Sequence, residues 1–241
     1  MQIGFKTDIG QRRENNEDSL FLLPEQNIYM VADGVGGHNS GEVASMTAVD
    51  SIAQYVKAHP MDGLLSDESI GNYFLECIQQ VNKKIFTLAK ENPDLAGMAT
   101  TIVILYLYEN NAYFTNVGDS RAYIIRSGEL IQVTEDHTYV NELLRNGSIT
   151  EEEAAVHPRK NMITRALGGE EKIHPDYYKY TVLEDDIIIL CSDGLYGEIN
   201  PEDILHMAAE AEDMDQLSTS LVDLANANGG SDNITIICIK I

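Results

Sequence analysis

Short runs rich in β-branched and aromatic residues recur along the 241-residue chain, and they constrain its fold more than any other feature. Turn-forming residues bound each run, which is typical of β-strands. The runs are Ser19–Leu23, Ile28–Ala32, Thr100–Tyr108, Ala112–Val117, Ala122–Arg126, Ile187–Cys191 and Ile234–Ile239. Glu109-Asn110-Asn111 joins two runs at hairpin distance, and Ser127-Gly128 joins another pair. We therefore expect mainly antiparallel pairing.

Apolar residues at helical spacing predict two pairs of amphipathic helices. They are expected at Gly41–Ala58, Ile70–Ala89, Pro201–Glu210 and Gln216–Ala227, and Pro201 after Asn200 is a favourable helix start. Helix pairs separated by blocks of strands predict an α+β fold, with the helices packed outside antiparallel sheets.

The segment Thr138–Pro175 has weaker strand character than its surroundings. We expect an irregular insert with two short helices, Tyr139–Asn146 and Glu151–His157. The chain has no low-complexity linker and no fixed-period repeat, so a single domain is the simplest interpretation.

The charge is strongly negative, with 39 Asp and Glu against 16 Lys and Arg and a net charge of −23. Such a surface repels nucleic acid and anionic membranes, so neither is expected as a partner. It also repels phosphorylated substrates, so a phosphate-handling enzyme of this charge needs local cations. No stretch reaches the roughly 18 apolar residues of a membrane span, and no signal-peptide pattern is present, so we expect a cytoplasmic protein.

The three cysteines, Cys77, Cys191 and Cys238, each lie in an apolar run, and no two form a CxxC pair. They are expected to be small buried side chains in a reducing compartment. A structural zinc site is not expected.

Four aspartates share one sequence context. Asp33 and Asp193 each follow a strand-like run and precede glycine, Asp119 follows a third run, and Asp232 precedes the run that begins at Ile234. Strand ends can deliver several carboxylates to one cleft, where a cation relieves their repulsion, and all-oxygen ligands favour Mg²⁺ or Mn²⁺. Asp-Gly is also an ordinary turn dipeptide, so the spacing alone leaves both interpretations open.

Arg13 lies just ahead of Glu17 and Asp18. Its planar guanidinium group can bind phosphate oxygens bidentately. An arginine among acids can equally be a solvated ion-pair partner, and its position permits both interpretations.

Six motifs together resemble those of the metal-dependent (type 2C, or PPM) Ser/Thr protein phosphatases, most of all their compact bacterial members. They are Arg13-x-x-Asn16-Glu17-Asp18, Val31-Ala32-Asp33-Gly34-Val35-Gly36-Gly37-His38, Ala99-Thr100-Thr101, Val117-Gly118-Asp119-Ser120-Arg121, Ser192-Asp193-Gly194 and Gly230-Ser231-Asp232-Asn233-Ile234-Thr235. Each motif alone is weak, but six in family order across nearly the whole chain are very specific.

The resemblance implies a four-layer αββα sandwich, in which two central antiparallel β-sheets are flanked by helix pairs. It implies that residues 1–241 form a single phosphatase catalytic domain. Residues 138–175 match the family's variable flap, an insert beside a metal-binding cleft at one end of the sandwich.

The resemblance also implies a core site for two Mn²⁺ or Mg²⁺ ions. Asp33 would bridge the two ions, and the carbonyl of Gly34 would join the coordination of one of them. Asp193 and Asp232 would ligate the other ion.

Further residues are implied around this core. Glu17 and Asp18 would hold metal-bound waters in an outer shell, so Asp18 also counts among the metal-site residues, and Asn233 would orient its neighbours. A third, more labile ion would be held by Asp119 together with Asp193.

At the position of the general acid, this sequence departs from some relatives. Val35 replaces the histidine that those relatives carry directly after Asp-Gly, whereas His38 matches the histidine of bacterial relatives. His38 could protonate the departing oxygen, or it could be a surface-loop residue. His137, His157 and His174 are weaker candidates, and His59 and His206 are expected to be solvated helix residues.

The implied activity is hydrolysis of phosphoserine and phosphothreonine on proteins. A metal-bridging water or hydroxide would attack phosphorus without a phospho-enzyme intermediate, and Arg13 would bind the phosphate oxygens. By analogy the partners are phosphorylated proteins and a cognate bacterial Ser/Thr kinase, and the chain is expected to be a monomer.

Covalent phosphatase mechanisms fit poorly. A cysteine nucleophile needs an arginine six positions later, but Lys83 follows Cys77 and Gly197 follows Cys191 at that distance, and the chain ends three residues after Cys238. An Asp-x-Asp nucleophile would need an acid where Val35 stands.

The sequence leaves two alternatives open: a pseudophosphatase that binds phosphoproteins, and a metal-dependent hydrolase of another ester such as a nucleotide. Hydrolysis of p-nitrophenyl phosphate with Mn²⁺ would separate an enzyme from a scaffold. A phosphothreonine peptide compared with a nucleotide would separate the two kinds of hydrolase.

Overall fold

Two antiparallel β-sheets lie face to face in the computed structural model, which describes residues 1–37, 40–61 and 66–241. In order across the first sheet, the strands are β1 (Gln2–Asp8), β11 (Ile234–Lys240), β10 (Ile187–Cys191), β7 (Arg121–Arg126) and β8 (Glu129–Gln132). The second sheet contains β2 (Asp18–Leu23), β3 (Ile28–Val35), β5 (Ile102–Tyr108), β6 (Asn111–Val117) and β9 (Asp176–Thr181), and β4 (Ala99–Thr100) pairs with the end of β3.

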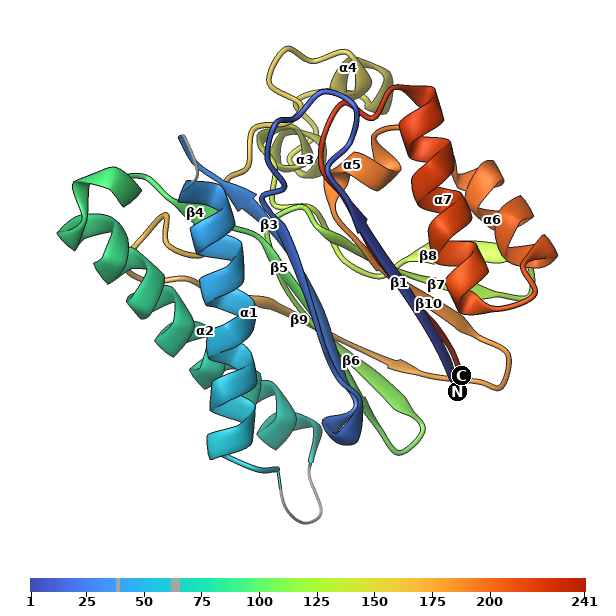
Figure 1. Cartoon of the computed structure of the whole chain (residues 1–241), viewed down its shortest axis with the longest axis horizontal. Helices are drawn as coiled ribbons and strands as arrows, with labels where there is room; N and C mark the ends of the chain where they lie inside the picture. Colours follow the sequence, from blue (N-terminus) through green and yellow to red (C-terminus); the bar gives the residue numbers. More distant parts are fainter. Residues whose placement is uncertain (38–39, 62–65) are drawn as a thin grey trace.

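A pair of helices covers the outer face of each sheet (Figure 1). The helices are α1 (Ser40–Ala58) and α2 (Asp67–Glu91) on the second sheet, α6 (Pro201–Glu210) and α7 (Met214–Asn228) on the first, α3 (Tyr139–Arg145) and α4 (Glu151–Ala155) in the insert, α5 (Asp193–Tyr196) after β10, and the 3₁₀ turns η1 (Pro24–Gln26) and η2 (Pro93–Leu95). This arrangement confirms the predicted α+β, four-layer αββα sandwich.

Three apolar layers hold the sandwich together. Side chains such as Tyr29, Phe114 and Ile237 fill the space between the sheets and are fully buried. Separate clusters lie under α1 and α2 and under α6 and α7. Each fully buried aliphatic or aromatic side chain contributes about 1.5–3 kcal/mol, so the sheets form a rigid support for the residues at their ends.

The helix starts follow from local chemistry. Ser66 caps α2 by accepting a hydrogen bond from the backbone of Ser69, and Asn200 caps α6 in the same way, directly before Pro201. Such caps satisfy backbone N–H groups that have no partner within the helix, and each contributes about 1 kcal/mol.

Some sequence expectations needed correction. The predicted strand Thr100–Tyr108 is divided at Thr101, because the Thr101 backbone N–H donates to the carbonyl of Asp33 and its hydroxyl accepts from the Asp33 N–H, both at 2.9 Å. Strands β1 and β9 were not predicted, since polar residues interrupt their apolar runs. The cysteines are buried and unpaired, as predicted.

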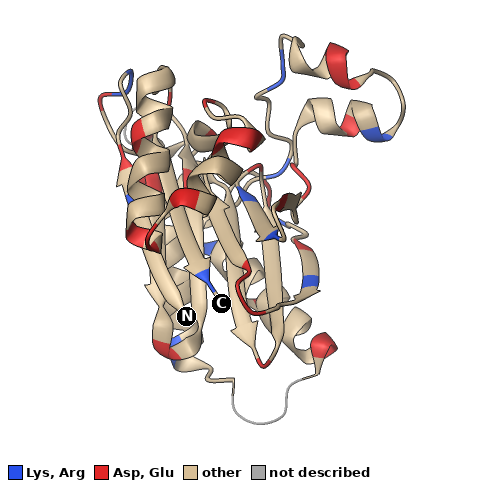
Figure 2. Ribbon diagram, turned by 90° about the vertical axis from the view of Figure 1, so that its right-hand side faces the viewer, with Lys and Arg blue, Asp and Glu red and all other residues tan. Residues whose placement is uncertain are grey.

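The insert stands out from the body at the end of the sandwich where α5 begins (Figures 1 and 2). Acidic residues are scattered over the helices and loops of the face in Figure 2 rather than gathered in one patch. Most of the negative charge therefore covers the surface, and the carboxylates at the strand ends form a separate group. None of the helices among the described residues is long and apolar enough to cross a membrane.

Candidate metal and phosphate site

Asp18 and Asp33 lie directly opposite each other in the register of β2 and β3. Asp18 is buried, and its Oδ2 accepts a 2.6 Å hydrogen bond from the hydroxyl of Ser192. Ser192 follows β10 in the other sheet and itself accepts from the backbone N–H of Thr235 on β11. This chain of hydrogen bonds fixes the ends of the two sheets against each other around the carboxylates.

Asp193 and Asp232 reach the same place from β10 and β11. Asp193 is the first residue of α5, and Asp232 lies two residues before β11. A side chain at Gly194 would place its Cβ 2.1 Å from the carbonyl oxygen of Asn233, so only glycine permits this close approach. The negative charge of Asp193 is close enough to Asp33 to raise the pKa of the Asp33 carboxyl.

The proximity of these acids changes their ionisation. Burial, followed by repulsion from Asp193 and Asp232, raises the pKa of Asp18 to about 7. Burial and the neighbouring carboxylates raise the pKa of Asp33 well above its ordinary value and that of Asp193 to about 6. In the absence of a cation, the cluster therefore binds protons instead.

Two buried carboxylate oxygens in the cluster, Asp18 Oδ1 and Asp193 Oδ1, have no hydrogen-bond partner among the residues that the structure describes. An unpaired buried oxygen of this kind costs about 1–3 kcal/mol unless something binds it. An all-oxygen set of acids with unpaired oxygens suits a hard divalent cation such as Mg²⁺ or Mn²⁺. The residues therefore fit the ions that the sequence predicts.

Asp119 lies in the turn between β6 and β7 and is only 4% exposed. Burial and then the negative charge of Asp193 raise its pKa to about 7. The preceding Gly118 has a left-handed φ of 104°, and a Cβ there would contact Thr101 at 2.5 Å. A glycine is thus needed to direct Asp119 toward Asp193.

Among the described residues, the carboxylates lie near one another but do not form a complete metal site. Among the residues that the structure describes, no three or more His, Cys, Asp or Glu side chains are already placed to hold one ion. Arg13 Nη2 donates to Asp232 Oδ2 at 2.5 Å, so a cation of the protein itself engages one of the predicted ligands. Both partners are partly exposed, so the pair can separate at small cost.

Asn233 and Glu17 hold the loop that carries Arg13. The Asn233 side-chain oxygen accepts from the backbone N–H of Glu17 at 2.7 Å, and its amide donates to the carbonyls of Ile9 and Asn15 at 2.9 Å. Burial raises the pKa of Glu17, but its role as holder of metal-bound water stays a prediction.

Gly34 allows three segments to meet behind the cluster. Its N–H donates to the carbonyl of Glu17, and a Cβ would lie 2.2 Å from the carbonyl of Gly41. Any larger residue at position 34 would therefore push α1 away from the end of β3. The predicted use of the Gly34 carbonyl as a metal ligand stays a prediction.

The candidate general acids differ in accessibility. His38 lies outside the described residues. His137 is buried, its Nδ1 accepts from the Gly118 N–H at 3.0 Å, and its Nε2 therefore carries the proton that it donates to Asp176 at 3.1 Å. With both ring nitrogens engaged, His137 is suited to positioning the turn before Asp119 rather than to proton transfer.

The other histidines lie away from the carboxylates. His157 packs against Tyr139 in the insert, and His174 lines a groove beside α2. His59 and His206 are exposed, as predicted.

A cleft of about 690 Å³ runs from the carboxylates to the insert. Asp119, Asp193 and Asp232 line one wall. Thr138, Asn141, Leu144, Glu151 and Lys160 are among the residues that line the other. Sequence reasoning brought the aspartates together but missed the insert residues, because nothing in that irregular segment shows which side chains point inward. It also gave no role to Ser192, although Ser192 directly precedes a predicted ligand.

The chain is similar to known proteins in both sequence and structure. The sequence pattern of the family described as Protein phosphatase 2C matches residues 7–234. The chain is 38% identical over 243 residues to the serine/threonine phosphatase stp of Listeria monocytogenes, covering 100% of this chain and 96% of that protein.

Solved structures agree. The S. agalactiae serine/threonine phosphatase superposes with a TM-score of 0.92 at 36% identity, over 100% of this chain and 99% of the other. The catalytic domain of the serine/threonine protein phosphatase PstP, solved with two manganese ions, superposes with a TM-score of 0.84 at 33% identity, over 98% and 96% of the two chains.

Proposed function

The chain belongs to the protein phosphatase 2C family, and from this premise we propose how its residues carry out the reaction. It is a metal-dependent Ser/Thr protein phosphatase, which acts on phosphorylated proteins. The family resemblance and the activity expected from the sequence are thus confirmed. The residue roles, the ions and the kinase partner that follow are proposals.

The metal ligands would be Asp33, which would hold both core ions, with the carbonyl of Gly34, Asp193 and Asp232. When bound, two such ions supply an activated water near neutral pH and stabilise negative charge on a phosphoryl group. The raised pKa of Asp33 supports this assignment, as does the buried Asp193 oxygen that lacks a partner in the described part of the chain.

Asp18 would complete the site from behind. It lies opposite Asp33, and Ser192 holds one of its oxygens, while the other has no partner within the described ranges 1–37, 40–61 and 66–241. Asp18 can therefore accept a hydrogen bond from a water in an outer shell without moving. Glu17 would act in the same way from the loop held by Asn233.

Arg13 would change partners during the reaction. It pairs with Asp232 in the structure, and cation binding at Asp232 would compete with that contact. The released guanidinium group offers a planar set of donors that fits two phosphate oxygens and can stabilise the charge that spreads over them in the transition state. His38 would donate the proton to the departing seryl or threonyl oxygen.

We propose Mn²⁺ or Mg²⁺ as the ions, two in the core and a third held by Asp119 with Asp193. The two manganese ions named for the PstP structure support the core pair, and the buried Asp119 supports a further site. Residues 1–241 would act as one catalytic domain, with the insert 138–175 as its flap. A cognate Ser/Thr kinase, a cytoplasmic location and a monomeric state stay predictions.

The observation that carries the proposal is a close group of acids drawn from the ends of both sheets, in which Asp18 and Asp119 are buried. The test is hydrolysis of p-nitrophenyl phosphate and of a phosphothreonine peptide by the purified chain with Mn²⁺, before and after chelation. We expect activity that disappears with the chelator and returns with added ion. Activity that is unaffected by chelation would contradict the metal assignment.

A further inference from the structure

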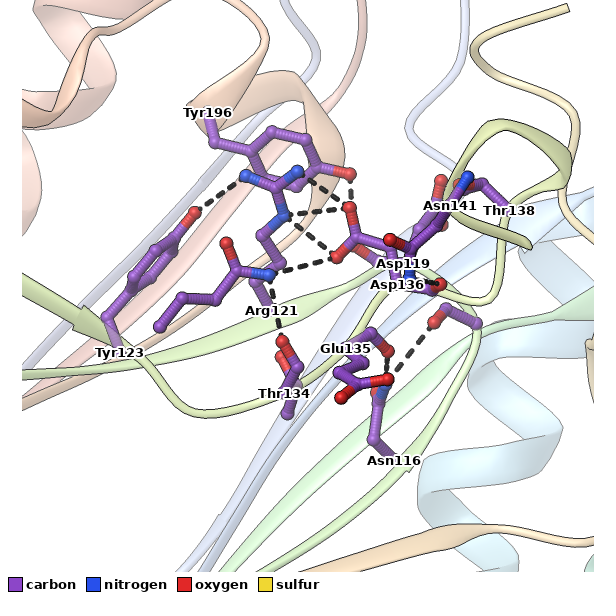
Figure 3. A network of polar contacts seen from close by, with 12 residues as sticks. Asn116, Asp119, Arg121, Tyr123, Thr134, Glu135, Asp136, Thr138, Asn141 and Tyr196 are labelled. Atoms are coloured by element: carbon purple, nitrogen blue, oxygen red, sulfur yellow. Dashed lines mark hydrogen bonds and ion pairs between the residues drawn. The ribbon is translucent and has the colours of Figure 1, made fainter. Parts of the chain in front are cut away.

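Arg121 lies between the carboxylates and the insert. The proposed function gives it no role, either as a metal ligand or in phosphate binding. Its Nε donates to Asp136 Oδ1 at 2.9 Å, and its Nη2 donates to Asp136 Oδ2 at 2.6 Å. Its remaining Nη1 donates to the hydroxyl of Tyr123 at 2.9 Å (Figure 3). The side chains of Arg121 and Asp136 are 23% and 15% exposed, so solvent screens the pair only partly.

The same guanidinium group stacks on Tyr196. The Arg121 Cζ atom is 3.5 Å from the centre of the tyrosine ring. The Tyr196 hydroxyl in turn donates to the backbone carbonyl of Asp119 at 3.0 Å. Because Tyr196 ends α5 and Asp193 begins it, Arg121 contacts the short helix that carries one predicted ligand and, through Tyr196, the turn that carries another (Figure 3).

Asp136 stands at the base of the insert. Its backbone carbonyl accepts a 2.8 Å hydrogen bond from the side chain of Asn141 in α3, which lines the cleft. The next residue, His137, exchanges two 3.0 Å hydrogen bonds with Gly118, directly before Asp119. Residues 136 and 137, which lead into the insert, are thus held next to the turn that bears Asp119.

We propose that Arg121 is a positioning residue that holds the insert wall of the cleft in place relative to Asp119 and Asp193, and so contributes to binding the protein chain around the phosphate. The part of this inference that concerns substrate binding rests on the proposed function. A lysine could keep the charge but would lose the two parallel hydrogen bonds and the stacking on Tyr196, so the identity of the residue matters.

The chain contains a matched control at the other end of β7. Arg126 binds Asp186 through the same two contacts, Nε to Oδ1 at 2.9 Å and Nη2 to Oδ2 at 2.6 Å. The Arg126 side chain is 29% exposed, close to the value for Arg121. Its other partner is the carbonyl of Thr181, so replacing it removes a similar ion pair far along the strand from the insert.

The test compares Arg121→Lys with Arg126→Lys in the full chain. Amide hydrogen exchange in α3 and α4 is measured first, without metal, because exchange reports local opening and does not depend on turnover. We expect exchange in these helices to accelerate about tenfold in Arg121→Lys and to stay at the wild-type rate in Arg126→Lys. Equal exchange in both variants would overturn the proposal.

Kinetic measurements then test whether Arg121 contributes to binding of the peptide substrate. In Arg121→Lys, KM for a phosphothreonine peptide should rise about fivefold or more, whereas kcat/KM for p-nitrophenyl phosphate, which has no chain to contact the insert, should change less than about twofold. A parallel loss for both substrates would show that Arg121 acts only through general stability. If Arg121→Lys does not fold, Asp136→Asn and Asp186→Asn form an equivalent pair, with the same two outcomes.

The exchange result also separates this inference from the proposed metal site. If α3 exchanges faster in Arg121→Lys while Asp33→Asn keeps full turnover, the positioning role of Arg121 is supported and the metal assignment is contradicted. If exchange is unchanged in Arg121→Lys, the positioning role is contradicted, whatever the activity of Asp33→Asn.

Discussion

The metal-free protein should lose stability as the pH rises from about 4 to 7, and Asp119 provides the clearest case. Its pKa is raised from 3.8 to about 7, mainly by burial and then by the charge of Asp193. Between these two values the folded chain binds a proton that the unfolded chain has released. The folded state is therefore favoured at the acidic end of the window, and this advantage is lost as the pH rises toward 7.

The magnitude follows from the size of the shift. A displacement of about three pKa units corresponds to at most about 4 kcal/mol for a single group. Asp119 is only 4% exposed, so solvent screening reduces this figure little, but its coupling to Asp193 means that the contributions of the two residues do not add. A loss of about 2–4 kcal/mol across the window is a large part of the usual 5–15 kcal/mol stability of a domain.

The assay is urea unfolding of wild type and Asp119→Asn in the presence of a chelator, at several pH values from 4 to 8. The amide keeps the shape of the side chain but cannot ionise. The two proteins should be similarly stable near pH 4, and Asp119→Asn should be more stable by about 2–4 kcal/mol near pH 7.5. Excess Mn²⁺ should remove much of the wild-type loss. If the free energies of unfolding of the two proteins change in parallel with pH, the raised pKa of a buried Asp119 is refuted.

Three further predictions concern the site itself. Asp33→Asn should lower kcat for p-nitrophenyl phosphate at least about a hundredfold, and titration calorimetry should show weaker binding of both core ions; near-wild-type turnover would remove the bridging role. Arg13→Ala should raise KM for a phosphopeptide about tenfold, as expected for the loss of one charge-assisted contact, while Mn²⁺ affinity is unchanged or improved because Asp232 is released; unchanged KM would remove Arg13 from phosphate binding. Ser192→Ala should destabilise the metal-free chain by about 1–3 kcal/mol in urea unfolding, since it removes the donor to buried Asp18, and no change would show that this hydrogen bond is dispensable.

The sequence predicted the parts of the fold that have a strong local pattern. Helix α6 was predicted with its observed bounds, because Asn200 and Pro201 define its start. Strand β9, Asp176–Thr181, was missed because exposed residues alternate along it, and its place at the sheet edge depends on pairing with β6. Such pairing is a property of the whole fold and leaves little trace in the segment itself.

The candidate site shows the same division. The aspartates could be grouped because strand ends and glycines mark them, and the structure brings Asp33, Asp193 and Asp232 to one end of the sandwich. The ion pair between Arg13 and Asp232 could not be predicted, since it joins residues 219 positions apart. Likewise, nothing in the local sequence shows that Arg121 forms a pair with Asp136 and stacks on Tyr196.

Anomalous scattering from a crystal soaked in Mn²⁺ tests the central claim most directly. Two strong peaks should lie beside Asp33, with Asp193 and Asp232 bound to one of them and Arg13 turned away from Asp232. A fully soaked crystal with no peak at this cluster, or with the contact between Arg13 and Asp232 intact beside unbound carboxylates, would contradict it.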